Sequence, residues 1–379
     1  MDGSIAIPGD TSAERLLRQV AASVPEMQQR APMLDEAAAF PTEELSRLRD
    51  LGALAAPVPQ LLGGLGWGSE SRGAVPLMHL LRLLGRGNLS VGRLFEAHVN
   101  ALRLVMRYGD PEQRALVARD ALDGHLFGLW VTDAPDAPVT LRPDGTLAGS
   151  KAPCSGAGYA SRALVTAALP SHGTQPSHGT RMLVIAAPGI ERVDRSGWDT
   201  QGMRAACNGR LCLDGVRPAA VIGAPGDYLR QPDFSAGAWR TSAVTLGGLE
   251  ALVGAMRQQL AARGRDGDQA QRARVGKALI ALETARAWVA RGAVIGEAHD
   301  GDVLDIANTV NLVRIAVETA SLEALQLVQR ALGLAAFRRG TLEELLLRDL
   351  ATYLRQPAPD ETLSEAAAHF MQRDLPDLT

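Results

Sequence analysis

The spacing of hydrophobic residues divides this chain into three blocks. Apolar positions recur every three or four residues up to about residue 123 and again from about residue 232, as they do along one face of an α-helix. Between these blocks, short apolar runs bounded by Gly, Pro, Asp and Ser are typical of β-strands. The pattern predicts a mainly helical α+β protein with an N-terminal α-helical domain (1–123), a central β domain (124–231) and a C-terminal helical bundle (232–379).

The N-terminal block is predicted to consist of helices joined by short turns. One helix begins near Thr11, another is entered through Pro111, and those between them cover Pro41–Leu51, Val75–Gly85 and Val91–Tyr108. The glycine-rich stretch Leu61–Gly68 could bind an anion through bare backbone amides. It follows no strand and lacks the Lys-Ser/Thr pair of a P-loop, which favours a structural turn.

The central block is predicted to form a small β-barrel or sandwich. Strands are expected at 125–132, 162–168 and 181–187, because each of these runs is apolar and is bounded by turn-forming residues. Asp144-Gly145 is a hairpin signal between two further short strands.

The C-terminal block is predicted to form an antiparallel four-helix bundle. Its long helices are expected at Ala238–Arg263, Gln269–Ala298 and Val303–Leu332, and shorter ones near Thr341–Tyr353 and Thr362–Gln372. Several apolar residues fall outside a single helix face, among them Trp288, Leu325, Leu327 and Val328. Such positions need a partner surface, which predicts a homodimer or a homotetramer.

No metal site is predicted. The segment Pro-Ser-His-Gly-Thr around His172 is repeated around His178, and neither histidine has a carboxylate or thiol beside it. A duplicated hairpin tip is therefore favoured over a pair of metal ligands. The three cysteines, Cys154, Cys207 and Cys212, have neither CxxC spacing nor a nearby histidine, and their odd number argues against a disulfide framework. They are expected to be small buried or half-buried residues.

The composition excludes several classes of partner. The net charge of −3 provides no excess of Lys and Arg for nucleic acid or an anionic membrane surface. No run of about 20 apolar residues occurs, and the N-terminus has no basic segment followed by an apolar one. These features predict a cytoplasmic protein that binds neither nucleic acid nor a membrane.

Short motifs at the joints between the blocks occur in the order found in one flavoprotein family. They are Leu54–Gly66, which ends in Gly-Gly-Leu-Gly, then Tyr108–Arg114, Leu147–Lys151, Gly197-Trp198 with Gly202–Ala205, Leu282–Arg286 and Arg348-Asp349. This series resembles the acyl-CoA dehydrogenase superfamily over nearly the whole chain. The resemblance implies an FAD-dependent oxidoreductase that acts on a CH–CH group of an acyl thioester or a related small molecule, with an acyl-CoA as one candidate.

The resemblance also implies which residues contact the flavin ring. Members of the family place a Thr on one strand, and a Thr or Ser on another, near the redox-active nitrogen of the ring. Trp130, Val131 and Thr132 fall on the first of these strands, and Ser155 falls on the second. A hydroxyl at this position would stabilise the charge that builds on the ring as hydride arrives. Ordinary strand-end residues are the alternative interpretation.

The part of the site that would bind the flavin pyrophosphate is less similar to the family. Arg263 lies where members have an arginine that reaches the flavin of a neighbouring subunit, and Gln329 and Gly333 lie in a Gln-x-x-Gly-Gly turn. Two glycines of that turn are replaced by Leu332 and Ala335, and these side chains hinder a close approach of the backbone to a dinucleotide. Arg263 could equally be a solvated charge at the end of a helix.

The carboxylate base of a dehydrogenase is missing at both positions where the family has one. Members use a Glu after the Arg-Asp motif, where this chain has Pro357, or an acid at the start of the first bundle helix, where it has Gly237–Arg240. Asp360 or Glu361 could act as a displaced base, although a carboxylate such as Asp360 is more simply an N-cap. The catalytic residue is therefore not assigned.

Two other functions remain open. A relative without the base could be a flavin-dependent monooxygenase or oxidase, and Ser155-Gly156 resembles the sequence that monooxygenase branches have at this strand. A non-catalytic family member acting as an assembly or ligand-binding subunit is the other alternative.

Overall fold

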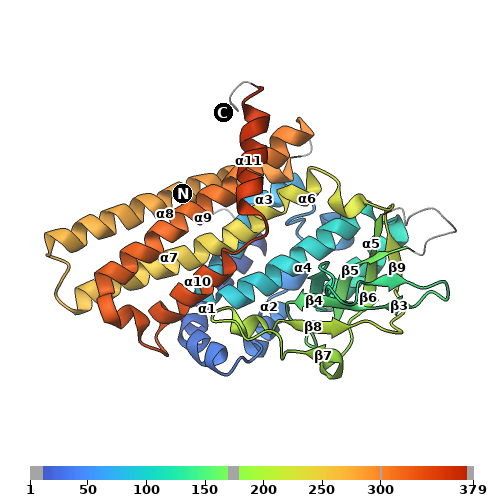
Figure 1. Cartoon of the computed structure of the whole chain (residues 1–379), viewed down its shortest axis with the longest axis horizontal. Coiled ribbons are helices and arrows are strands. Elements are labelled where there is room, and N and C mark those ends of the chain that lie inside the picture. The colour runs from blue at the N-terminus through green and yellow to red at the C-terminus, as the bar shows by residue number, and fades with distance from the viewer. Residues whose placement is uncertain (1–11, 170–178, 299–300, 374–379) are drawn as a thin grey trace, which may run out of the picture.

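The computed structural model describes residues 12–169, 179–298 and 301–373. Helices form both ends of the described chain and strands form its middle, so the fold is α+β and mainly α, as predicted (Figure 1). The last N-terminal helix ends at Leu122 and the first strand begins at Phe127. The domain boundaries at 123/124 and 231/232 stay predictions. The repeated segment with His172 and His178 lies outside the described residues.

The N-terminal helices confirm the predicted periodicity. They are α1 (Ser12–Glu36), α2 (Thr42–Asp50), α3 (Ala74–Gly87), α4 (Leu89–Tyr108) and α5 (Pro111–Leu122). The side chain of Asn88 accepts hydrogen bonds from the first turn of α4, and Asp110 and Gln113 form a capping box at the start of α5. In the glycine-rich stretch, Gly63, Gly66 and Gly68 have positive φ, which glycine adopts without steric cost and which agrees with a structural turn.

The central strands form two sheets. The larger contains β1 (Phe127–Trp130), β2 (Thr140–Leu141), β3 (Leu147–Ala148), β5 (Arg162–Ala168), β6 (Thr180–Ala186) and β9 (Ala220–Ile222). The smaller contains β4 (Ser150–Cys154), β8 (Gly209–Cys212) and β7 (Val193–Asp194), in that order. The strands β2 and β3 pair as the hairpin predicted from Asp144-Gly145. The three cysteines are free, with Cys154 and Cys207 buried and Cys212 half-buried, as expected.

A buried histidine joins the N-terminal helices to the larger sheet. His98 on α4 is fully buried; its Nε2 lies 2.8 Å from the carbonyl oxygen of Leu54, and its Nδ1 accepts a hydrogen bond of 3.1 Å from the backbone N–H of Phe127. These partners require a neutral ring that donates from Nε2. Burial lowers the pKa of His98 to about 4, which keeps the ring neutral at pH 7.

The C-terminal block consists of the short helix α6 (Asp233–Ala236), the long helices α7 (Ala238–Ala262), α8 (Gln269–Glu297) and α9 (Val303–Leu332), and then α10 (Leu342–Tyr353) and α11 (Pro359–Phe370). Figure 1 shows α7, α8 and α9 extending away from the strands, and α11 projecting from the bundle. The predicted N-cap role of Asp360 is wrong. The helix begins earlier, so Ala358 is its N-cap residue and Asp360 lies within its first turn.

Helix α7 is the centre of the packing, because it contacts α8, α9 and α10 and also α3 from the N-terminal block. Two glycines permit the contact with α3. A Cβ atom on Gly85 would lie 2.0 Å from the carbonyl oxygen of Val244, and one on Gly247 would lie 2.0 Å from that of Arg82. The helix backbones therefore approach each other more closely than any residue with a side chain would allow.

Part of the sequence argument for an oligomer is wrong. Leu325 and Val328 are buried in the chain's own core, and Trp288 and Leu327 pack partly against it. Leu325 and Val328 need no second subunit, because α7 and α8 already contact α9. Other apolar residues of α8 are exposed, including Ile280, which is 69% exposed. The oligomeric state stays a prediction. Within the described residues, none of the helices combines the length and the apolar character needed to span a membrane.

The Arg-Asp motif holds the β domain against the bundle. Asp349 on α10 accepts a hydrogen bond of 2.6 Å from the backbone N–H of Met203, and Arg348 donates to the carbonyl oxygen of Gln201. Arg348 also lies 2.9 Å from Asp35 on α1. Burial and then the nearby charge of Asp35 raise the pKa of Asp349 to about 7. This motif of the family therefore has a structural role in the chain.

Candidate active site

A cleft of about 300 Å³ lies where the three blocks of the chain meet. Its walls come from α4, from Leu129 and Val131 at the end of β1, from the corner between α6 and α7, from α9 and from the loop after α10. The lining combines apolar side chains with several charged ones, as is usual for sites that bind small molecules.

One wall of the cleft is a polar stripe on α4 that the sequence analysis missed. Arg93, Glu96, Asn100, Arg103 and Arg107 are spaced by three and four residues, so they share one face of the helix. A charged face of a helix normally faces water, but Glu96 is only 2% exposed and Arg103 only 6%. The spacing alone could have revealed the stripe. Its burial depends on the bundle, which is distant in sequence.

Below the cleft, Glu297 at the end of α8 binds two arginines from different helices. Its carboxylate accepts a hydrogen bond of 3.2 Å from Nε of Arg103 and another from Arg240 on α7. Nε1 of Trp239 donates a third, at 3.1 Å. Because all four side chains are buried, this carboxylate neutralises charges that water cannot reach.

Asp233 on α6 is an acidic residue of the cleft wall, and it is fully engaged. It accepts hydrogen bonds of 2.6 Å from Nη1 of Arg103 and 2.7 Å from the hydroxyl of Tyr108, and Nε of Arg107 lies at 3.3 Å. Burial alone would raise its pKa, but Arg103 and the Tyr108 hydroxyl hold the pKa of Asp233 below its ordinary value. A carboxylate in this setting is a poor proton acceptor.

Glu96 is the other acidic residue among the described residues that line the cleft. Its Oε2 lies 2.5 Å from Nη1 of Arg93, and its Oε1 accepts hydrogen bonds from Asn100 and, at 3.2 Å, from Thr241. Three side-chain donors therefore bind this carboxylate directly. These hydrogen bonds engage both oxygens and orient the carboxylate within the wall.

Both positions at which a dehydrogenase of this family has its base line the cleft. Gln356 and Pro357 come from the loop after α10, and Gly237 and Ala238 from the start of α7. None of the four has an acidic side chain. The displaced candidates Asp360 and Glu361 are exposed on α11 and do not line the cleft.

The residues predicted to contact the flavin ring lie beside this cleft, on two adjacent strand ends. Nε1 of Trp130 donates a hydrogen bond of 2.9 Å to the carbonyl oxygen of Ser155, and the backbone N–H of Ala152 donates one of 3.1 Å to the carbonyl oxygen of Thr132. Val131 lines the cleft itself, whereas the side chain of Thr132 is exposed. The structure thus brings these residues together.

Ser155 is connected to the cleft wall through its hydroxyl. The hydroxyl donates a hydrogen bond of 2.7 Å to Oδ1 of Asn208, and Nε of Arg93 lies 3.4 Å away. The buried Lys151 supports the same region, because its ammonium group binds the carbonyl oxygen of Val131 at 2.9 Å and the carboxylate of Asp133 at 2.6 Å. Asn208 had no signal in the sequence that could have identified it.

The predicted pyrophosphate residues form a separate group at the other end of the bundle. Nη1 of Arg263, at the end of α7, donates to the carbonyl oxygen of Leu332 at 3.3 Å, and Nη2 donates to Gln259. Gly333 follows with a φ of 61°, and Gln329 lines a different hollow of about 620 Å³. The structure brings Arg263 next to the turn that contains Gln329 and Gly333, but it places none of the three in the cleft.

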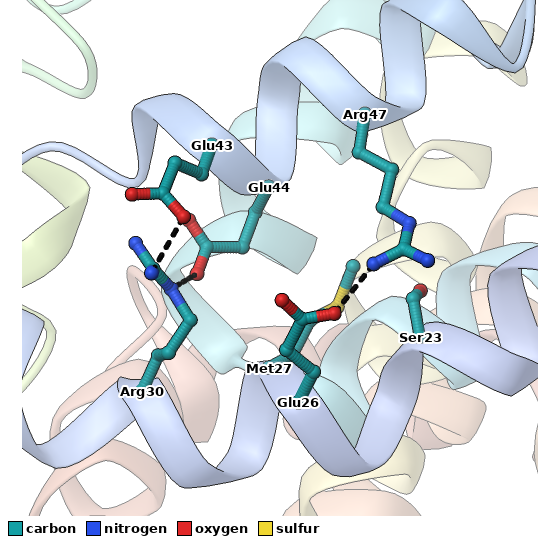
Figure 2. A pocket seen from close by; sticks show the side chains of 7 residues that line it. All are labelled: Ser23, Glu26, Met27, Arg30, Glu43, Glu44 and Arg47. Atoms are coloured by element: carbon teal, nitrogen blue, oxygen red, sulfur yellow. Dashed lines mark hydrogen bonds and ion pairs between the residues drawn. The ribbon is translucent and has the colours of Figure 1, made fainter.

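One other polar hollow has a structural explanation. Figure 2 shows it between α1 and α2, where Arg30 points towards Glu43 and Glu44, and Arg47 towards Glu26. Its volume of about 40 Å³ is small, and its carboxylates already pair with arginines. This hollow therefore joins two helices and offers no room for a substrate.

A group of Asp302, Asp305 and His369 could in principle hold a metal ion. The group is partly exposed, Asp302 caps the start of α9, and Arg373 lies 3.2 Å from both aspartates. His369 pairs with Asp305 at 2.6 Å. These contacts account for the cluster as a junction between α9 and α11.

Comparisons with known proteins agree with this geometry. Residues 11–125 match the family described as acyl-CoA dehydrogenase, N-terminal domain. The structure of butyryl-CoA dehydrogenase from Megasphaera elsdenii superposes with a TM-score of 0.81 over 98% of this chain and all of that one, at 15% identity. Residues 11–125 are thus similar to the N-terminal domain of acyl-CoA dehydrogenases, and the chain has the acyl-CoA dehydrogenase fold.

The chain also resembles proteins whose names indicate a reaction other than dehydrogenation. The chain is 29% identical over 227 residues to the amino sugar nitrososynthase DnmZ of Streptomyces peucetius, covering 56% of this chain and 54% of that protein. It is also 29% identical over 213 residues to the dibenzothiophene monooxygenase of Mycolicibacterium goodii, covering 52% of this chain and 48% of the other. The chain thus spans about half the length of these curated relatives.

A solved structure of KijD3 in complex with FMN and a dTDP-amino-keto-sugar superposes with a TM-score of 0.79, at 21% identity, covering 97% of this chain and 95% of that one. At such low identity, the likeness to this structure and to the butyryl-CoA dehydrogenase is evidence of a shared fold. The fold thus occurs in complexes with different small molecules.

Proposed function

We propose that this chain is a flavin-dependent monooxygenase with the acyl-CoA dehydrogenase fold, and that the cleft binds its substrate. The observation that carries the proposal is the cleft lining. The two positions that would supply a dehydrogenase base are present in the wall, and they hold Pro357 and the pair Gly237-Ala238. Without a base, removal of the α-proton of an acyl thioester has no acceptor.

The acids that do line the cleft do not replace this base. Asp233 and Glu96 each accept several hydrogen bonds from arginine, tyrosine, asparagine or threonine side chains. The lowered pKa of Asp233 weakens it further as a proton acceptor at neutral pH. Oxygenation therefore fits the cleft better than the dehydrogenation of a CH–CH group.

A flavin ring fits the strand ends beside the cleft. The Thr132 carbonyl oxygen accepts a hydrogen bond from the backbone N–H of Ala152, and the Ser155 carbonyl oxygen accepts one from the Trp130 side chain. The Ser155 hydroxyl can donate to a bound group in place of Asn208. A reduced flavin bound there would supply the electrons that activate dioxygen. In this arrangement Ser155 orients the reacting group, Lys151 fixes the Val131 carbonyl, and Leu129 and Phe234 give the cleft an apolar part.

The cofactor is proposed to be a flavin, and its nucleotide is a separate question. FAD is the cofactor that the superfamily resemblance implies, with Arg263, Gln329 and Gly333 at its pyrophosphate. The side chains of Leu332 and Ala335 hinder a close approach of the backbone of this turn to a dinucleotide, and Arg263 already donates to the Leu332 carbonyl oxygen, which supports FMN as the alternative. Chromatography of the nucleotide released from the purified protein distinguishes the two.

The remaining expectations belong to the same proposal. The DnmZ and dibenzothiophene monooxygenase matches support a small-molecule substrate with a nitrogen or sulfur atom to be oxygenated. A homodimer or homotetramer would cover the exposed apolar residues of α8, including Ile280. A location in the cytoplasm agrees with the absence of a candidate membrane span among the described helices.

The test supplies the purified protein with reduced FMN or FAD from a separate reductase and measures substrate-dependent oxygenation of a panel of amines and sulfides. We expect product with at least one class, and a loss of tenfold or more, about 1.4 kcal/mol, in Ser155→Ala. Ser161→Ala is the matched control, because the Ser161 hydroxyl binds His125 away from the cleft. If the protein took up neither FMN nor FAD, the proposal of a monooxygenase would be refuted. The alternative of a non-catalytic assembly or ligand-binding subunit would then remain.

A further inference from the structure

One arginine of the cleft is not matched by an acidic side chain. Arg93 pairs with Glu96, and Arg103 and Arg240 share Glu297. Arg314 on α9 lines the same cleft, and none of the carboxylates in the described parts of the chain lies within ion-pair distance of it. Its charge is therefore available to a ligand.

The hydrogen bonds of Arg314 leave part of its guanidinium group unused. Nη1 lies 3.4 Å from the hydroxyl of Thr362, and Nη2 donates to the carbonyl oxygen of Pro357. Both acceptors are neutral. Nε is buried without an acceptor among the described residues. Since a guanidinium group has five N–H donors, several remain for a further partner.

The charge of the whole lining points the same way. Four arginines and two acidic residues line the cleft, so the lining carries two more positive than negative charges. Burial lowers the pKa of Arg314, and the closest opposing influence is the negative charge of Glu318. A half-buried cation without a partner is costly, and an anion bound beside it would offset that cost.

The position of Arg314 is also informative, because its Nη2 binds the carbonyl oxygen of Pro357. Pro357 stands where a dehydrogenase of the family has its negatively charged base. The chain therefore has no negative charge at this point, and the described residues provide no ion-pair partner for the arginine beside it.

We propose that Arg314 binds an oxyanion group of the substrate, a carboxylate, a sulfinate or a phosphate ester, within the cleft. The inference rests on the proposed function, since it takes the cleft as the substrate site. The planar guanidinium group suits two parallel hydrogen bonds to such a group. The cleft volume of about 300 Å³ is at the lower end of the range for ligand pockets, which indicates a small anionic substrate.

The experiment measures binding directly, by calorimetry on the full-length protein with and without added FMN or FAD. The probes are benzoate and phenyl phosphate, with benzamide as a neutral molecule of nearly the same shape as benzoate. We expect both anions to bind at least tenfold more tightly than benzamide, and this preference to disappear in Arg314→Gln. Arg355→Gln is the control, because Arg355 is exposed, pairs with Glu318 and does not line the cleft.

Arg314→Lys is a second variant that keeps the charge but loses the planar fork, and we expect it to keep part of the preference for anions. This variant decides the question if Arg314→Gln does not fold. Equal binding of benzoate and benzamide, a preference for anions that survives in Arg314→Gln, or no binding of either anion at millimolar concentration would overturn the proposal. If the protein bound no flavin, the proposed function would be refuted. The preference for anions is also measured without flavin, so the role of Arg314 is tested independently of that result.

Discussion

Removing the buried carboxylate of Glu297 should lower the free energy of unfolding of the protein. In Glu297→Gln, the side chain keeps its shape but no longer neutralises Arg240, whose side chain is 2% exposed, whereas Arg103 keeps its ion pair with Asp233. Breaking a buried ion pair by removing one partner typically costs about 3–5 kcal/mol, because the other charge stays buried and unpaired. We expect a loss of this size in the free energy of unfolding, measured by urea titration at pH 7.

Glu250→Gln is the matched control for this substitution. Glu250 also binds two arginines, but Arg82 and Arg286 are 25% and 42% exposed and can reach water when the carboxylate is removed. We expect a cost of about 1 kcal/mol or less. The double variant Glu297→Gln with Arg240→Met should be more stable than the sum of the single effects predicts, because it removes both charges of this buried pair. A Glu297→Gln variant as stable as Glu250→Gln, or strictly additive effects, would refute this reasoning.

Three further predictions concern stability. His98 is neutral in the folded protein, because its pKa is lowered from 6.5 to about 4. Below pH 6.5 the unfolded chain therefore binds more protons than the folded one. In paired urea titrations, the free energy of unfolding of wild type should fall by up to about 3 kcal/mol between pH 7 and pH 4, relative to that of His98→Gln. Asp349 should give the opposite pH dependence, because its pKa is raised from 3.8 to about 7. As the pH rises from 4 to 8, the free energy of unfolding of wild type should fall by up to about 4 kcal/mol relative to that of Asp349→Asn. Parallel curves of stability against pH for the two proteins would contradict this. In thermal unfolding, Gly247→Ala should destabilise the protein by about 1–3 kcal/mol, because the added methyl group clashes with the Arg82 backbone. Gly254→Ala, in open space on the same helix, should stabilise the protein by about 0.5–1 kcal/mol. The reverse order of stability would mean that α3 and α7 do not pack this closely.

The sequence was sufficient to predict the elements, because their local patterns are strong. The helix periods of α4, α7, α8 and α9 and the apolar runs of β5 and β6 each lie within one stretch of chain, and the structure confirms them. The start of α11 was misplaced, since Pro359 supports a helical first turn and Ala358 adopts a positive φ that no local signal indicates.

The cleft was harder to predict, because it depends on contacts between distant segments. The family resemblance named Trp130, Ser155 and Pro357, and the structure places the first two in contact and the third in the cleft wall, while their roles stay predictions. The sequence could not show that the stripe on α4 is buried, or that Glu297 lies below it, since these residues are about 200 positions apart in the chain. Asn208 and Arg314 likewise gain their meaning only from residues on other elements.

Flavin uptake followed by anaerobic mixing with acyl-CoA thioesters tests the central claim most directly. The protein is incubated with FMN or FAD, freed of excess flavin, and its visible spectrum is recorded before and after the thioester is added. We expect near-stoichiometric flavin and no bleaching by thioesters of any chain length, because the cleft has no base. Bleaching by an acyl-CoA would contradict the assignment as an oxygenase, and a colourless protein would show that the strand ends at Thr132 and Ser155 hold no flavin.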